Sequence, residues 1–153
     1  MNFLLYALGV LILSGVVSLG VSRWSKPANA IGAFGAVSAC VLGLAAVGVY
    51  HAEPLALDLP WAVPFGSFSV AMDSVGIIFL FPIFILCAAA ALYGVAYLKH
   101  YYGKKNIGSV WLFFNVLIAS MVLVVLARNA ILFLFAWELM SVSSFFLVLF
   151  EGE

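Results

Sequence analysis

A few polar side chains interrupt one of the most apolar stretches of this chain. Glu138, Ser141 and Ser144 lie in "LFAWELMSVSSFFLVLF", a run otherwise dominated by Phe, Leu and Val. An ionised carboxylate at the centre of a bilayer costs at least about 2.5 kcal/mol, so it is retained only where something compensates for that cost. A carboxylate that changes its protonation with its surroundings can relay protons, whereas one that stays protonated can hydrogen-bond a neighbouring helix. Proton transfer and a structural contact are therefore the two hypotheses.

The spacing of these residues places them on a predicted helix over 130–150. At a rise of about 1.5 Å per residue, Glu138 lies about 3 Å from the middle of that helix. Ser141 and Ser144 follow at intervals of three, so the three side chains form a polar stripe that winds around one side. Such a stripe must face protein or water.

The composition indicates that the surrounding elements lie in lipid. Hydrophobic residues make up 67% of the 153 residues and charged residues 8%, whereas soluble domains average about 25% charged. In lipid every backbone N–H and C=O must be paired within the spanning element, which favours helices. The long continuous apolar runs argue against the short alternating strands of a β-barrel. No basic patch with interleaved aromatic residues suggests nucleic acid as a partner.

Five apolar runs are long enough to cross the roughly 30 Å hydrocarbon core, which takes about 20 helical residues. We therefore expect an all-α membrane protein, a single transmembrane domain over 1–153 with helices at about 2–22, 28–50, 72–98, 109–127 and 130–150. The first run lacks the basic start of a signal peptide, so we interpret it as a retained span.

The connections between the runs predict a hairpin and an orientation. Pro54, Pro60 and Pro64 exclude a helix between the second and third spans, and the residues that follow favour a short extended or hairpin element. The first and third connections carry five of the six Lys and Arg residues, and such loops usually face the cytoplasm. We expect a multi-pass protein of the inner (cytoplasmic) membrane, with its N-terminus outside and its C-terminus inside.

Other polar residues of the spans have structural explanations beside functional ones. Asp73 is expected to cap the third helix. Tyr93 and Tyr97, one turn apart, either line a hydrated passage or belong to the aromatic belt at the membrane interface. Asn115 is expected to hydrogen-bond a neighbouring helix. Pro82 removes one backbone donor and is expected to kink its helix, which membranes tolerate where neighbours or water satisfy the freed carbonyl.

Small residues in the second span predict close helix packing. They recur at four-residue spacing, which lets helix backbones approach, in two rows: Gly32, Ala36, Cys40 and Gly35, Ala39, Gly43. Cys40 and Cys87 lie in separate apolar runs without a nearby His, so we interpret both as small buried hydrophobes and expect no metal site in this chain.

Three stretches carry a resemblance to a known family. "LFAWELMSVSSFFLV", "FSVAMDSVG" and "YGVAYLKHYY" resemble the proton-translocating antiporter-like membrane subunits. That family is shared by NADH–quinone oxidoreductase, hydrogenases of the hydrogenase-4 and formate hydrogenlyase type, and multisubunit cation/proton antiporters. The sequence around Glu138 looks closest to that of hydrogenase-4 component B.

The resemblance implies a proton-translocating subunit of an oxidoreductase complex, with no redox site of its own. Iron–sulfur, nickel-iron or flavin centres are then expected in partner subunits, and the partners are other membrane subunits, a peripheral electron-transfer arm and lipid. In that family the glutamate matching Glu138 pairs with a lysine on a later helix. The alternatives are a cation/proton antiporter subunit that exchanges sodium for protons, and a purely structural membrane subunit.

The chain also departs from the family pattern. Members have about fourteen spanning helices in two inverted repeats, whereas this sequence predicts five. No Lys or Arg lies in the middle of any predicted span, so the partner of Glu138 is absent. The chain is expected to be an N-terminal fragment of such a subunit, a truncated reading frame or one part of a split subunit.

Overall fold

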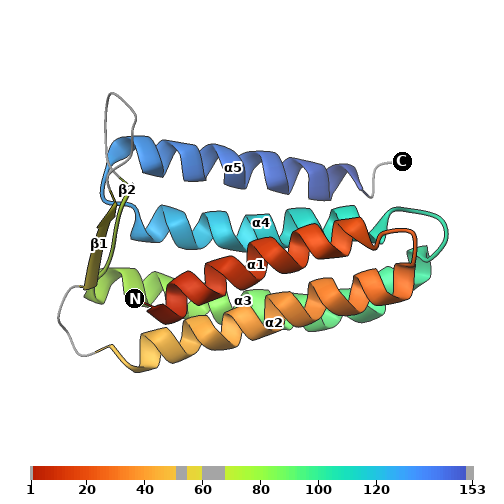
Figure 1. The fold of residues 1–153 in the computed structure, drawn as a ribbon, viewed down its shortest axis with the longest axis horizontal. Helices are drawn as coiled ribbons and strands as arrows, with labels where there is room; N and C mark the ends of the chain where they lie inside the picture. The colour runs from red at the N-terminus through yellow and green to blue at the C-terminus, as the bar shows by residue number, and fades with distance from the viewer. Residues whose placement is uncertain (1, 51–54, 60–67, 151–153) are drawn as a thin grey trace.

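Five long helices form the computed structural model, which describes residues 2–50, 55–59 and 68–150. The helices are α1 (Asn2–Gly20), α2 (Ser25–Gly48), α3 (Ser74–Leu98), α4 (Ile107–Leu126) and α5 (Ala130–Leu149). They run up and down in a bundle with their axes nearly aligned (Figure 1). Each is long and apolar enough to cross a membrane. The predicted all-α membrane fold is therefore confirmed.

Three helices begin at residues other than the predicted ones. α2 starts at Ser25 and includes Pro27 in its first turn, where a backbone N–H would have no partner within the helix. α3 starts at Ser74 because Met72, predicted to open the helix, belongs to a strand. α4 starts at Ile107, two residues before the prediction, because the side chain of Asn106 caps it. The other helix ends agree with the predictions within two residues.

The predicted hairpin between the second and third helices is also present. β1 (Leu55–Leu59) and β2 (Phe68–Met72) pair antiparallel, with Leu55 opposite Met72 and Leu59 opposite Phe68. The hairpin lies at the end of the bundle near the N-terminus, and the C-terminal end of α5 lies at the opposite end (Figure 1). The connections that carry the five basic residues lie at this opposite end as well, which we call the basic end.

The third connection is ordered by a short helix and one glycine. After α3 the chain continues into the 3-10 turn η1 (Lys99–Tyr101). Gly103 then adopts a φ of 74°, a left-handed conformation that glycine tolerates at little cost, and the chain reverses toward α4. The third connection is thus a compact turn.

Glycines of α2 allow the close packing that the sequence predicted. A methyl group added at Gly32 would overlap the indole of Trp111 in α4, and one added at Gly43 would overlap the ring of Phe84 in α3. Gly35 stands equally close to Ser14 of α1. α2 is therefore in tight contact with three neighbours, and no larger side chain fits at these positions.

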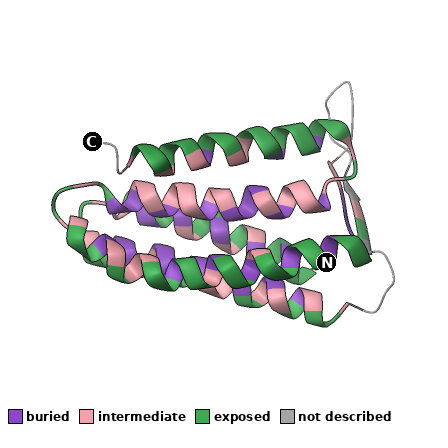
Figure 2. Ribbon diagram, turned by 180° about the vertical axis from the view of Figure 1, so that it is seen from behind, coloured by how far each residue is buried: buried purple, intermediate pink, exposed green. Residues whose placement is uncertain are grey.

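The helices differ strongly in how far they are buried. α2 and α4 supply many of the buried residues, whereas α5 has three, Leu132, Ala136 and Ser143. Figure 2 shows α5 as the outermost helix, exposed along most of its length, with α4 between it and the rest of the bundle. One face of α5 is therefore left uncovered by the residues that the structure describes.

Candidate functional site

Glu138 lies near the middle of α5, on its uncovered side. The residue is exposed, whereas Ala136 and Ser143 are buried on the side that packs against α4. Counted along α5, Glu138 is about 2 Å from the midpoint of the helix. Within the part of the chain that the structure describes, no ion pair or hydrogen bond involves its side chain. The carboxylate therefore faces away from α4 and the rest of the described bundle.

The two serines of the predicted stripe differ in their surroundings. Ser141 is exposed like Glu138, and Ser144 is half-buried and donates a hydrogen bond to the carbonyl of Ser141 at 2.9 Å. Ser143, which was not among the predicted site residues, is buried and donates to the carbonyls of Leu139 (2.8 Å) and Met140 (3.0 Å). Its seven-residue interval from Ala136 could have indicated the inner face of the helix.

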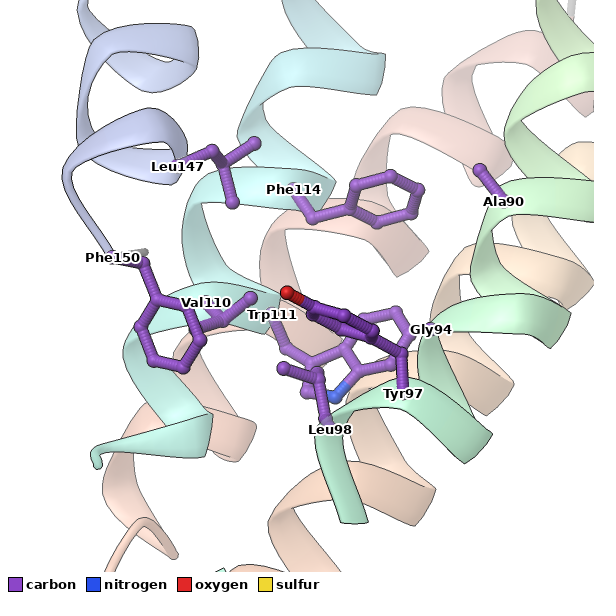
Figure 3. A pocket seen from close by; sticks show the side chains of 9 residues that line it. All are labelled: Ala90, Gly94, Tyr97, Leu98, Val110, Trp111, Phe114, Leu147 and Phe150. Carbon is purple, nitrogen blue, oxygen red and sulfur yellow. The ribbon is translucent and has the colours of Figure 1, made fainter. Parts of the chain in front are cut away.

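A small cavity opens between α3, α4 and α5 near the basic end (Figure 3). Its volume is about 200 Å³. The lining is apolar and aromatic apart from Tyr97, and consists of Ala90, Gly94, Tyr97, Leu98, Val110, Trp111, Phe114, Leu147 and Phe150. Glu138 is not part of this lining, so the cavity does not bring the predicted carboxylate and the tyrosines together.

The tyrosines form a row along α3 that ends at the basic end. The rings of Tyr93 and Tyr97 stack with their centroids 5.9 Å apart, and the hydroxyls of Tyr97 and Tyr101 are 3.2 Å apart. Tyr93 is 70% exposed on the outer surface, whereas Tyr97 is half-buried and lines the cavity. The two residues therefore share a row but not an environment.

Asp73 caps α3 as predicted and also pairs with a cation. Its carboxylate accepts a hydrogen bond from the N–H of Gly76 at 2.7 Å and lies 2.8 Å from the guanidinium of Arg128. The guanidinium of Arg128, and next the N–H of Gly76, lower the pKa of the Asp73 carboxyl below its ordinary 3.8. The partner was not predicted because 55 residues separate the two in the chain.

Arg128 also joins the hairpin to the turn between α4 and α5. Its N–H donates to the carbonyl of Ser69 at 2.9 Å, and its guanidinium reaches the carbonyl of Ala71 at 3.4 Å. Next to it, Val70 and Ala127 form an isolated antiparallel bridge. This cluster fixes the start of α5 at the hairpin end, about 12 Å along the helix from Glu138.

A buried amide that sequence reasoning missed joins three helices near the basic end. Asn29 of α2 donates to the carbonyl of Val95 in α3 (3.0 Å) and to the hydroxyl of Tyr102 (2.7 Å), and it accepts from the indole N–H of Trp111 in α4 (2.8 Å). The position of Asn29, an amide near the start of an apolar span, could have indicated this interhelical contact. These bonds position Trp111 beside the cavity.

Asn115, predicted to join helices, does so with longer bonds. Its amide nitrogen lies 3.3 Å from the hydroxyl of Ser14 in α1 and 3.4 Å from the carbonyl of Gly32 in α2. Its side-chain oxygen is buried and has no hydrogen-bond partner in the structure. Leaving such an acceptor unpaired costs about 1–3 kcal/mol.

Metal-binding geometry is not found in the described residues. No group of three or more His, Cys, Asp or Glu side chains comes together there, and Cys40 and Cys87 are both free and buried. The titratable groups at hand for chemistry in the spans are therefore carboxyl, hydroxyl and thiol groups of single residues.

Comparison with known proteins finds similarity to membrane subunits of respiratory and antiporter complexes. No family model matches the chain. It is 35% identical over 85 residues to hydrogenase-4 component B of Escherichia coli (strain K12), an alignment that covers 56% of this chain and 12% of that protein. It is 32% identical over 87 residues to NADH-ubiquinone oxidoreductase chain 5 of Paramecium tetraurelia, covering 57% and 15%.

Two further matches extend over nearly the whole chain. The putative antiporter subunit mnhA2 of Staphylococcus aureus (strain MRSA252) is 28% identical over 152 residues, which cover 97% of this chain and 19% of that protein. A chain of the membrane-bound sulfane sulfur reductase, an archaeal respiratory membrane complex, superposes with a TM-score of 0.70 at 22% identity, covering 92% of this chain and 22% of its own.

These findings confirm the resemblance drawn from the sequence. The chain is similar to the antiporter-like membrane subunits over part or most of its length, and its five apolar helices indicate an integral, multi-pass membrane protein. It spans 12 to 19% of the length of these three curated relatives.

Proposed function

We propose that this chain is the N-terminal part of a proton-translocating membrane subunit in a complex of the hydrogenase-4 or NADH–quinone oxidoreductase type. Electron transfer takes place on partner subunits, in a peripheral arm that carries the iron–sulfur, nickel-iron or flavin centres. Similarity to hydrogenase-4 component B and to NADH-ubiquinone oxidoreductase chain 5 supports this class. The observation that carries the proposal is Glu138, a carboxylate near the midpoint of α5 on its uncovered face.

The uncovered face of α5 is mostly apolar, but contact with lipid is unfavourable there because the face carries Glu138. An ionisable group at the middle of a bilayer normally faces protein or a water-filled passage, because hydrocarbon does not solvate charge. We therefore propose that further helices, on a longer form of this subunit or on a second polypeptide, cover α5. One of them carries the basic residue that pairs with Glu138.

Such a pair can move a proton by electrostatics alone. A cation close to the carboxylate favours release of its proton, and withdrawal of that cation favours proton uptake. Ser141, exposed on the same helix, can orient a water molecule or the carboxylate itself. Asp73 and the row of Tyr93 and Tyr97 lie elsewhere in the bundle, and we assign them structural roles.

The distribution of basic residues supports one orientation in the membrane. Arg23, Lys26, Lys99, Lys104 and Lys105 belong to the basic end, and such connections usually remain on the cytoplasmic side. We propose that the basic end faces the cytoplasm and the hairpin faces outward, in the inner membrane.

Replacing Glu138 in the complete complex tests the proposal. Gln keeps most of the hydrogen-bonding capacity of Glu but cannot titrate, so Glu138→Gln should assemble normally and lose substrate-driven proton translocation. Glu138→Asp, the matched control, keeps a titratable group and should retain part of the translocation. Unaltered pumping by Glu138→Gln would exclude the proton-transfer role and leave a structural membrane subunit.

A cation/proton antiporter subunit is the second candidate, and the length of the match to mnhA2 favours it. In that case the carboxylate of Glu138 takes part in the exchange of sodium for protons. Proton flux measured in vesicles separates the two candidates. Dependence on sodium supports the antiporter, and dependence on hydrogen, formate or NADH oxidation supports the first proposal.

A further inference from the structure

A hollow lies between α2 and α3 at the basic end, away from Glu138. Its volume is about 440 Å³, and it is lined by Lys26, Asn29, Ala30, Val95, Lys99 and Tyr102. A second hollow of about 570 Å³ adjoins it, shares Lys26 and Tyr102, and extends along the first residues of α2 to Trp24. Together they form one groove, which we call the α2–α3 groove.

The charge of this groove is positive. Lys26 and Lys99 come from different helices and are both exposed at its edge. Among the residues that the structure describes, the basic end carries five Lys and Arg side chains and no carboxylate, and neither lysine has an ion-pair partner there. The groove therefore presents two ammonium groups to an anion.

On the buried side of the groove, the hydroxyl of Tyr102 is available to donate a hydrogen bond. Asn29, only 2% exposed, donates one hydrogen bond to the carbonyl of Val95 and one to the oxygen of Tyr102. Because the Tyr102 oxygen accepts that bond, its own O–H is directed elsewhere, and no acceptor for it occurs among the described residues. Two ammonium groups and a hydroxyl donor are a suitable set for a phosphate.

The position of the groove at the end of the spans decides the source of that phosphate. Trp24, 69% exposed, lies at the start of α2, where an indole ring is expected at the headgroup level. Ala30 and Val95 give the groove apolar walls, and Phe34 is 76% exposed one turn deeper along α2. Acyl chains can follow this surface while the phosphate stays at the lysines.

We propose that the α2–α3 groove binds the headgroup of an anionic phospholipid. Lys26, Lys99 and the hydroxyl of Tyr102 hold the phosphate, and the acyl chains run along the apolar surface of α2 and α3. Basic pockets between membrane helices recognise such headgroups. The site is independent of the proton-transfer proposal, because it shares no residue with the face around Glu138.

Spin-labelled lipids test the site in the full chain reconstituted into phosphatidylcholine vesicles. The immobilised fraction of spin-labelled phosphatidylglycerol, relative to spin-labelled phosphatidylcholine, measures the preference for the anionic headgroup. The variant Lys26→Gln/Lys99→Gln should lower this preference about fivefold for each lysine removed. The matched control Arg23→Gln/Lys104→Gln removes the same charge from the same end without touching the lining and should keep most of the preference.

Equal losses in the two double variants would overturn the site in favour of diffuse attraction, and no loss in either would overturn it outright. Tyr102→Phe, which keeps the charge, should weaken the preference by a smaller factor. Inorganic phosphate added to the vesicles should not release the labelled lipid. Release would show that the groove recognises a free anion and would overturn the lipid assignment.

Discussion

Buried Asn side chains inside the bundle of α1 to α4 are hydrogen-bonded to neighbouring helices, whereas the carboxylate on the outer face of α5 has no such bond among the described residues. Inside the bundle, Asn29 satisfies all its polar atoms on three partners from other segments, and Gly32 lets the indole of Trp111 pack directly on a backbone. On α5, Glu138 stands on an exposed surface with no described partner. The first region thus satisfies its polar groups almost entirely within the described chain, and the second exposes a polar group without a described partner.

This contrast separates residues that specify the fold from residues that need another surface. Close helix contacts made by small residues and interhelical hydrogen bonds are what hold membrane helices together, because lipid is as apolar as their side chains. Polar groups that such contacts leave unsatisfied point to something outside the chain. Substitutions in the two regions should therefore differ in their cost to stability as much as the regions differ in their contacts.

The largest effect on folding is expected at the glycine contact inside the bundle. Gly32→Ala forces a methyl group into Trp111 and should lower the free energy of unfolding by about 1–3 kcal/mol. Gly9→Ala, the matched control, meets no atom within 4 Å and should be neutral or slightly stabilising. Phe135→Ala, at a residue 57% exposed on α5, should change stability by no more than about 0.5 kcal/mol. Reversible unfolding in detergent measures all three, and an equal loss for Gly32→Ala and Phe135→Ala would remove the contrast.

A smaller effect should distinguish the two buried amides. Asn29→Leu leaves the buried indole N–H of Trp111 without its acceptor and should cost about 1 kcal/mol. Asn115→Leu removes only two long hydrogen bonds and also the unpaired oxygen, so its cost should lie within about 0.5 kcal/mol. The same unfolding measurement applies, and a greater loss for Asn115→Leu would show that its oxygen is satisfied in the membrane.

The smallest effect is expected where the two regions are joined, at the pair of Asp73 and Arg128. Because folding lowers the pKa of this carboxyl, the pair contributes stability above the ordinary pKa of 3.8, and this contribution is lost as the pH falls through the lower folded value. Arg128→Gln should move the carboxyl titration midpoint, followed by NMR, upward toward 3.8. A midpoint that is the same in both proteins would mean that the ion pair does not form in solution.

The elements of the fold could be predicted from the sequence because a span in lipid must be a long apolar helix that pairs its own backbone N–H and C=O groups. Each of the five helices was recognisable as an apolar run, and the prolines between the second and third spans marked the hairpin. Errors arose at helix starts, where local capping decides the boundary. Pro27 lies inside a helix rather than before it, and Met72 belongs to a strand because Asp73 is the cap.

The contacts between distant residues could not be predicted in the same way. The row of small residues indicated close packing but not that Gly32 meets Trp111 or that Gly43 meets Phe84. Likewise, the capping role of Asp73 could be predicted locally, whereas its pairing with Arg128 depends on how the hairpin meets the turn before α5. The role of Glu138 remains a prediction, since no partner of its carboxylate occurs among the described residues.

Infrared difference spectroscopy of the complete complex during turnover tests the central claim most directly. We predict that a carboxyl C=O band changes as the complex passes between resting and energised states, and that this change disappears in Glu138→Gln while the complex remains assembled. A difference spectrum that is identical in the wild type and in Glu138→Gln would show that this carboxyl never changes its protonation and would contradict the account.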